Sequence, residues 1–286
     1  SVTTGLSNTI VGALAGDALT DADFNVALGR SALTDDTLGS KTVAVGYNAL
    51  GTQNFTTATD TFNTAVGFEA GVAVTTGDQN TFVGSLAGDA VTQGTRNVAL
   101  GVSTLGSDTK GSRSVAVGNF ALSTQNLTTA TNVYNVAVGH DAGKSITTGV
   151  NNTIVGGLAG DALTDGTNNV ALGTTALTSD TRGARSVAIG SAALESQNFT
   201  TTTTAYNVAI GFTAGQSITT GTSNTLIGGL CGDSMTTGSS NTAVGVHAIG
   251  SGTVTGSDNT AMGFNAGSSL TSGSNNLYLG HDAAIS

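Results

Sequence analysis

The sequence predicts an all-β protein, a parallel β-solenoid, from its composition and from one short repeat. The 286 residues include 42 glycines and no proline, and only 9% of them are charged. Glycine, threonine, serine and asparagine dominate the polar positions, and these residues are poor in helix interiors while suiting turns and strands. Because 38% of the residues are hydrophobic, the chain can bury a core and is not expected to be disordered.

The repeat is a five-residue unit that opens on asparagine, serine or threonine and closes on an aliphatic residue and glycine. Its glycines are Gly12, Gly29, Gly46, Gly67, Gly84, Gly101, Gly118, Gly139, Gly156, Gly173, Gly190, Gly211, Gly228, Gly245, Gly263 and Gly280. Successive glycines are mostly 17 residues apart, with intervals of 21 residues in three places and 18 in one. The units therefore group into a superperiod of 72 residues, in which Gly12, Gly84, Gly156 and Gly228 are equivalent.

A 17-residue period matches one turn of a β-solenoid, whose coils stack about 4.8 Å apart. We therefore expect about 16 coils of 17–21 residues in a single repeat domain over residues 1–286, forming a rod about 75 Å long. Alternation within each unit places Val26 and Leu28 on one face and Ala27 on the other. We assign the aliphatic face to the coil interior. The alanine stripe would then lie outside and need covering, which predicts self-association along the rod axis.

Two further columns are expected to be structural. Small residues three positions after the motif glycines predict a second short strand in each coil, and Cys231 stands in this column as an inert packing residue. Members of the column are Ala15, Ala32, Ala49, Ala70 and Ala87. The asparagine that opens many units, as in Asn25 and Asn97, predicts a ladder of amides hydrogen-bonded along the solenoid.

Charge and cysteine content narrow the functional classes. A net charge of −10 would repel a phosphate backbone, so no nucleic-acid partner is expected. One cysteine allows no internal disulfide, and the sequence has no cluster of cysteine and histidine that suggests zinc. No apolar run approaches the roughly 20 residues of a membrane helix, so no membrane insertion is expected in this segment.

The sequence contains no convincing enzyme signature, and we expect no catalytic residue, no cofactor and no metal. The histidines follow motif glycines in different coils and have no nucleophile at a fixed offset. The pairs His140-Asp141 and His281-Asp282 leave open a metal bound on the axis of stacked copies. A lesser alternative is a hexapeptide-type acyltransferase solenoid, but only one such hexad occurs in each coil and 17 is not a multiple of six.

The three 21-residue coils are the best candidates for recognition, at residues 53–62, 125–134 and 197–206. Each holds a threonine-rich stretch between bulky side chains, and loops on a rigid β scaffold commonly carry binding. The candidate receptor contacts are Phe55, Thr56, Phe62, Leu127, Thr128, Tyr134, Phe199, Thr200 and Tyr206. Aromatic and hydroxyl side chains suit carbohydrate, whereas the alternative is a spacer loop packed by its own aromatics or against another chain. The nearby pairs of Asp108 with Lys110 and Asp180 with Arg182 are interpreted as solvated loop decoration or bridges between chains.

The repeat resembles that of known fibres. Residues 114–118 (Ser-Val-Ala-Val-Gly), 186–190 (Ser-Val-Ala-Ile-Gly) and 63–67 (Asn-Thr-Ala-Val-Gly, followed by Ala-Gly) are similar to head repeats of YadA-type trimeric autotransporter adhesins. The same repeat style resembles shaft segments of bacteriophage and marine-bacterial tail fibres. The resemblance implies a left-handed parallel β-roll, three copies of which form a homotrimer. The adhesin repeat is shorter, so the additional residues here are expected to enlarge the loops.

These observations predict the shaft or head of a phage tail fibre that mediates attachment to a host surface. Its partners would be two further copies of itself and a host glycan or protein receptor, and its location would be extracellular, on a virion. The alternative is the head of a bacterial surface adhesin that binds host matrix or glycans. Because residues 1–8 align with residues 145–152 and no cap is visible, we expect a segment of a longer fibre.

Overall fold

The computed structural model describes residues 3–250 and 252–284. All regular structure in these residues is β, and together they form a parallel β-solenoid of about 16 turns, as the repeat predicts. No helix that could cross a membrane is found in this part of the chain. The chain divides into two compact units, residues 1–141 and residues 142–286, which are described in turn.

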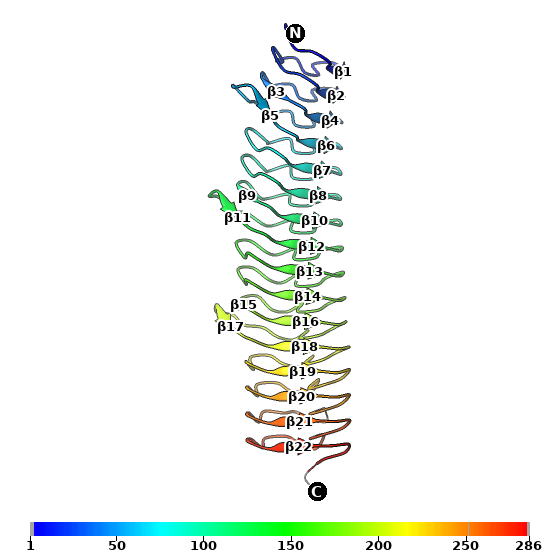
Figure 1. Cartoon of the computed structure of the whole chain (residues 1–286), viewed down its shortest axis with the longest axis vertical. Coiled ribbons are helices and arrows are strands. Elements are labelled where there is room, and N and C mark those ends of the chain that lie inside the picture. The colour runs from blue at the N-terminus through cyan, green and yellow to red at the C-terminus, as the bar shows by residue number, and fades with distance from the viewer. Residues whose placement is uncertain (1–2, 251, 285–286) are drawn as a thin grey trace. The chain divides into compact units, whose positions relative to one another are not determined.

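The first unit is a stack of coils, each of which contributes one three-residue strand to a parallel main sheet (Figure 1). In spatial order the strands are β1 (Thr9–Val11), β2 (Val26–Leu28), β4 (Val43–Val45), β6 (Thr64–Val66), β7 (Thr81–Val83), β8 (Val98–Leu100), β10 (Val115–Val117) and β12 (Val136–Val138). Equivalent residues pair across neighbouring strands, as Ala27 does with Ala44. The spacing of the repeat therefore sets the register of the sheet.

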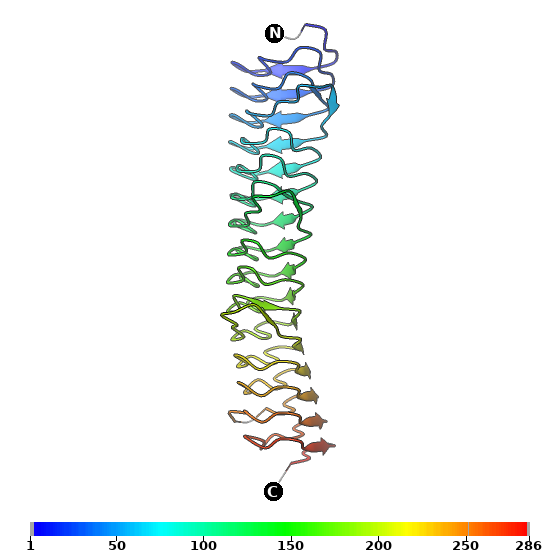
Figure 2. The same ribbon diagram turned by 90° about the vertical axis from the view of Figure 1, so that its left-hand side faces the viewer.

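The second unit repeats this arrangement, and its strands follow one another coil by coil (Figure 2). Its main-sheet strands are β13 (Thr153–Val155), β14 (Val170–Leu172), β16 (Val187–Ile189), β18 (Val208–Ile210), β19 (Thr225–Ile227), β20 (Thr242–Val244), β21 (Thr260–Met262) and β22 (Leu277–Leu279). The coil that ends at Gly263 is one residue longer than its neighbours, yet Ala243 still pairs with Ala261. The additional residue is therefore absorbed in a loop.

Among the described residues, further strands occur only where a 21-residue coil stacks on the coil before it. They are the parallel pairs β3 (Gly39–Ser40) with β5 (Thr59–Asp60), β9 (Gly111–Ser112) with β11 (Thr131–Asn132), and β15 (Gly183–Ala184) with β17 (Thr203–Thr204). In Figure 1 each pair lies on the far side of its coils from the main-sheet strands. The prediction of a second strand at the alanine column is wrong, because Ala32, Ala49 and Ala87 are buried in turns.

The motif glycines allow the coils to stack closely at a corner. Gly29 has φ +133°, and a Cβ atom there would overlap the carbonyl oxygen of Gly46 in the next coil. A residue with a side chain is therefore disfavoured at Gly29, both because φ is positive and because the Cβ atom would overlap the backbone of Gly46. This requirement recurs at the corner of almost every coil, which explains the high glycine content.

The assignment of the two strand faces from the sequence is wrong. Ala27, Ala44 and nearly all of their equivalents are buried in the coil interior, whereas Val26 and Leu28 point outward and are half-buried. The coil is thin, so the wall of turns opposite the sheet leaves room for only a small side chain at the centre of most strands. The face of the sheet that points outward is consequently the one that carries the larger aliphatic side chains, such as Val26 and Leu28.

Inside the coils, a small residue at the centre of a strand goes with a large residue in the turn, and a large strand residue goes with a small turn residue. Ala99 faces inward in a coil whose turn carries the buried Leu105. Where the strand instead carries Phe82, the turn carries Gly88, and a Cβ atom at Gly88 would lie 2.6 Å from the Phe82 ring. Gly71 of the preceding coil is under the same constraint, at 2.8 Å. A large residue at the centre of a strand therefore requires glycine in the facing turns, in keeping with close packing of protein interiors.

The asparagine ladder is confirmed. The side-chain oxygen of Asn97 accepts a hydrogen bond of 2.9 Å from the backbone N–H of Ser114, and its amide donates one of 2.9 Å to the carbonyl of Gly111. These bonds satisfy polar groups that are buried between coils. Cys231 is also buried, and burial raises the pKa of its thiol to about 12, which agrees with an inert packing role.

Candidate recognition site on the long coils

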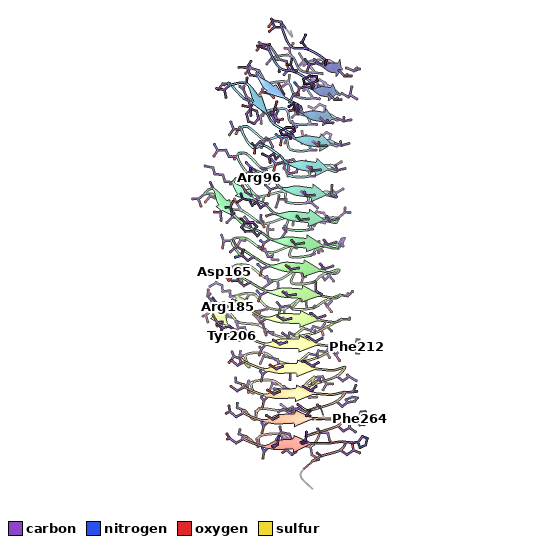
Figure 3. The ribbon with its side chains drawn as sticks, in the orientation of Figure 1. Arg96, Asp165, Arg185, Tyr206, Phe212 and Phe264 are labelled. Atoms are coloured by element: carbon purple, nitrogen blue, oxygen red, sulfur yellow. The ribbon has the colours of Figure 1, made fainter. Side chains whose placement is uncertain are left out.

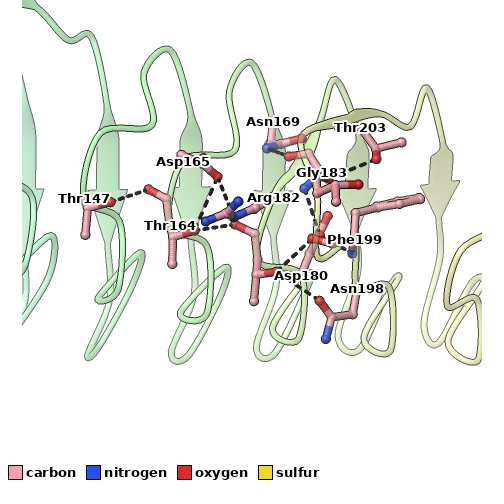
Figure 4. Close-up of polar contacts among 12 residues, drawn as sticks. Thr147, Thr164, Asp165, Asn169, Asp180, Arg182, Gly183, Asn198, Phe199 and Thr203 are labelled. Carbon is pink, nitrogen blue, oxygen red and sulfur yellow. Dashed lines mark hydrogen bonds and ion pairs between the residues drawn. The ribbon is translucent and has the colours of Figure 1, made fainter.

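A buried carboxylate anchors each long coil. The Oδ1 atom of Asp180 accepts hydrogen bonds from the backbone N–H groups of Gly183 (3.0 Å) and Phe199 (3.1 Å), as Figure 4 shows. Asp36 accepts the equivalent bonds from Gly39 and from Phe55 of the following long coil, and Asp108 accepts them from Gly111 and Leu127. All three side chains are buried, so the interpretation of Asp108 and Asp180 as solvated loop residues is wrong.

A glutamine joins each carboxylate to the asparagine ladder. Gln125 donates to Asp108 Oδ2 (2.5 Å) and to Ser114 Oγ (3.0 Å), while its oxygen accepts from the amide of Asn135 (2.9 Å). Ser114 stands where most coils have the ladder asparagine, so Gln125 supplies the missing amide. The sequence contained a signal for this role: a threonine or serine at the ladder position is followed 11 residues later by glutamine, as in Thr42 with Gln53.

The buried environment of these carboxyl groups changes their pKa. Burial raises the pKa of Asp36, Asp108 and Asp180 above the ordinary value of 3.8, and the hydrogen bonds from glutamine and from the backbone oppose that shift in part. The carboxyl groups of the anchor therefore take up a proton at a higher pH than an ordinary aspartate does.

The nine candidate receptor contacts divide into two groups. Phe55, Leu127 and Phe199 are less than a tenth exposed and pack inside the coil, where they support the loop. The remaining six lie at the surface: Thr56, Thr128, Thr200, Phe62, Tyr134 and Tyr206. The exposed aromatic side chains are 54%, 51% and 55% accessible, respectively, which is unusual for large aromatic groups.

Each exposed aromatic residue is paired with a cation from the preceding coil, an arrangement that the sequence analysis missed. The guanidinium carbon of Arg185 lies 5.7 Å from the centre of the Tyr206 ring, and its Nη1 donates to the tyrosine hydroxyl (3.1 Å; Figure 3). Arg113 lies 5.5 Å from the Tyr134 ring. Lys41 lies 5.2 Å from the Phe62 ring. These distances are typical of cation–π contacts.

The backbone presents these side chains at a corner of the coil. Arg185 and Tyr206 both have left-handed backbones, with φ 61° and 50°, and each directly precedes a ladder residue. The same position is left-handed throughout the stack, so the conformation is a property of the coil. It produces a column of side chains, one in each coil, at the edge where the main-sheet strands begin. Arg113 is half-buried, and the other members are exposed.

Other titratable groups do not converge. His140 Nδ1 lies 3.5 Å from Asp141 Oδ2, and His281 Nδ1 lies 3.0 Å from Asp282 Oδ2. Arg182 Nε lies 3.6 Å from Asp165 Oδ1, so Arg182 pairs with this residue of the preceding coil (Figure 4). Over residues 3–250 and 252–284 there is no group of three potential metal ligands and no pocket.

The fold and this surface define a class: a parallel β-solenoid repeat protein that displays cation–aromatic pairs on anchored long coils. No known family model matches the chain, and no curated protein matches it in sequence.

Proposed function

We propose that the chain is a structural, non-catalytic segment of a homotrimeric extracellular fibre of the phage tail-fibre type, which attaches to a host surface. In this proposal each copy is a left-handed β-roll, and three copies associate through their main sheets. The 72-residue superperiod would then repeat the anchored long coils along the fibre as elements for attachment.

The observation that carries this proposal is an apolar outer face on each unit. We use this name for the outward-facing first and third residues of the main-sheet strands together with the exposed hydrophobic residues that follow some of the motif glycines, namely Tyr47, Phe68, Val102, Phe212, Val246 and Phe264. Val83 is 38% and Met262 45% exposed, although both lie in a sheet. Figure 3 shows Phe212 and Phe264 just beyond the ends of β18 and β21, at the opposite end of the strands from Arg185 and Tyr206.

Aromatic side chains extend the apolar outer face around the corner. Tyr47 and Phe68 stack with ring centres 5.2 Å apart, and both are more than two-fifths exposed. Contiguous apolar surface of this kind marks an interface in soluble proteins. A second copy of the chain is the occupant that we propose for it, because in a parallel, in-register assembly the aliphatic columns of neighbouring copies, which continue from coil to coil, can meet along their length. The low content of charged residues, 9%, also favours surfaces shared between copies.

Thiol labelling tests where the interface lies. In Val83→Cys the new thiol would sit on the outer face, whereas in Thr128→Cys it would sit on an exposed loop. Native Cys231 gives little background, because burial raises the pKa of its thiol to about 12. We expect the Val83→Cys thiol to be protected at micromolar protein and the Thr128→Cys thiol to react freely. Equal labelling of the two variants would contradict the proposal.

A further inference from the structure

From residue 24 onward, the corner column of the first unit concentrates aromatic and cationic side chains, of which Arg113 is half-buried and the others are exposed. In successive coils it reads Phe24, Lys41, Phe62, Gln79, Arg96, Arg113 and Tyr134. All seven residues have left-handed backbones and directly precede a ladder residue. Neighbouring members are about one strand spacing apart, roughly 4.8 Å, so the column forms a continuous track along the stack.

Direct contacts connect the members of this track. Arg96 Nε donates to the side-chain oxygen of Gln79 (3.2 Å), and Arg113 stacks on Tyr134. The backbone N–H groups of Arg96 and Arg113 donate to carbonyls of the preceding coil, those of Asp78 (3.1 Å) and Thr95 (3.0 Å). The two arginine side chains are thus presented on a backbone that is fixed by the coils.

The charge of the track is unusual for this protein. The chain has 8 basic and 18 acidic residues, yet residues 90–140 contain the basic Arg96, Lys110 and Arg113 and a single acidic residue, Asp108, which is buried. Lys41 is offset by Asp60, whose carboxylate lies 2.5 Å from its Nζ. In the described part of the chain neither Arg96 nor Arg113 has a carboxylate within ion-pair distance. Within the corner column, Arg96 and Arg113 are therefore two neighbouring cations without an ion-pair partner.

We propose that this track binds a linear anionic polysaccharide that lies along the stack of coils. Guanidinium groups recognise carboxylate and sulfate through paired hydrogen bonds, and exposed rings such as Tyr134 stack against the apolar faces of sugar rings. A chain-like ligand suits a track that repeats once in each coil. This inference rests on the proposed attachment function and names the class of surface that the fibre recognises.

The second unit lacks an equivalent arginine pair. The residue 72 positions after Arg96 is Asn168, so Arg185 stands alone beside Tyr206. The second cation of that region, Arg182, is paired with Asp165 at 3.6 Å. We therefore place the site in the first unit.

The test is a binding titration of the full chain with polygalacturonate, dextran sulfate, neutral dextran and an oligothymidylate. We expect binding to the carboxylated or the sulfated polymer, whichever anion the site selects, and none to neutral dextran. Arg96→Ala and Arg113→Ala should each weaken binding about ten-fold, the usual effect of losing a charge-assisted hydrogen bond. Tyr134→Ala should weaken it several-fold, and Tyr134→Phe should retain it because the ring remains.

The matched control is Arg30→Ala. It removes the same charge from an exposed arginine that stacks on Tyr47 (5.9 Å) at the other corner of the coil. We expect it to leave affinity unchanged. An equal loss in Arg30→Ala would show general charge attraction, and arginine-dependent binding of oligothymidylate would show a nucleic-acid site; either result overturns the proposal. Binding of neither anionic polymer by protein that light scattering shows to be trimeric overturns it while leaving the proposed fibre intact.

Discussion

Gln125 donates a hydrogen bond of 2.5 Å to the buried carboxylate of Asp108, one coil earlier. The same glutamine also bonds Ser114 and Asn135, so the base of the long coil is tied to the asparagine ladder on both sides. The additional residues of the long coil are therefore held on a rigid support. Rigid support reduces the ordering cost of any binding at the exposed loop residues.

Removing the carboxylate should destabilise the fold. In Asp108→Asn, the new amide would face the Gln125 amide that now donates to Oδ2, so one buried donor would lose its acceptor. We expect a loss of about 1–3 kcal/mol in the free energy of unfolding, measured by urea titration. Asp258→Asn is the control, because Asp258 is exposed and its left-handed backbone suits asparagine. A loss in Asp108→Asn no larger than in this control would contradict the anchoring role.

The buried aspartates should give an unusual dependence of stability on pH. Because burial raises the pKa of Asp36, Asp108 and Asp180 above 3.8, the folded state takes up protons at higher pH than the unfolded state. Their contribution to stability is fully present below pH 3.8 and is lost as the pH rises through the raised pKa values. We expect the stability advantage of the wild type over Asp108→Asn to grow as the pH falls from 7 toward 4. A shrinking advantage would show that the carboxylate is preferred in its charged form.

The pairing of large with small residues in the core predicts that substitutions of Phe82 and Gly88 are strongly coupled in their effects on stability. Phe82→Ala should cost about 3 kcal/mol or more by leaving a cavity, and Gly88→Leu alone should clash with the ring. The double variant recreates the Ala99 and Leu105 pairing of a neighbouring coil. Leu105 has φ 53° and Gly88 has φ 61°, so leucine can adopt the backbone required at residue 88. We expect the double variant to be more stable than either single variant in thermal unfolding; additive losses would refute this packing rule.

Charges placed on the outer face should disrupt self-association. Leu100→Lys combined with Val117→Lys adds two cations to adjacent, half-buried positions of the main sheet. Because lysine at these positions still reaches solvent in a single chain, the coil should fold, while burial between copies would carry a large desolvation cost. We expect sedimentation to show a shift toward monomer that Thr128→Lys does not cause. An unchanged mass in the double variant would place the interface elsewhere.

The periodicity of the sequence was sufficient to predict the solenoid, its parallel strands, the asparagine ladder and the location of the long coils. The strand faces were reversed, because alternation alone distinguishes two faces without saying which is inside. Alanine was the inner residue here because the opposite wall of turns is close. The turn residues that fill this wall, such as Leu105, have left-handed backbones, which the sequence does not show directly.

The candidate site was predicted only in part. The long coils were located by their length, and Phe62, Tyr134 and Tyr206 do lie at the surface. Their pairing with Lys41, Arg113 and Arg185 was missed, because it joins residues of neighbouring coils through a left-handed corner. The burial of Asp108 was also missed, since the adjacent Lys110 suggested a surface ion pair, whereas the partner of Asp108 is a glutamine 17 residues later.

The central claim is that three copies of this chain associate, and its mass in solution tests that claim most directly. One chain has a mass of 27.8 kDa. Multi-angle light scattering at micromolar concentration should give three times this value, without change on moderate dilution. A stable species of 27.8 kDa under these conditions would contradict the trimer and the role proposed for the outer face.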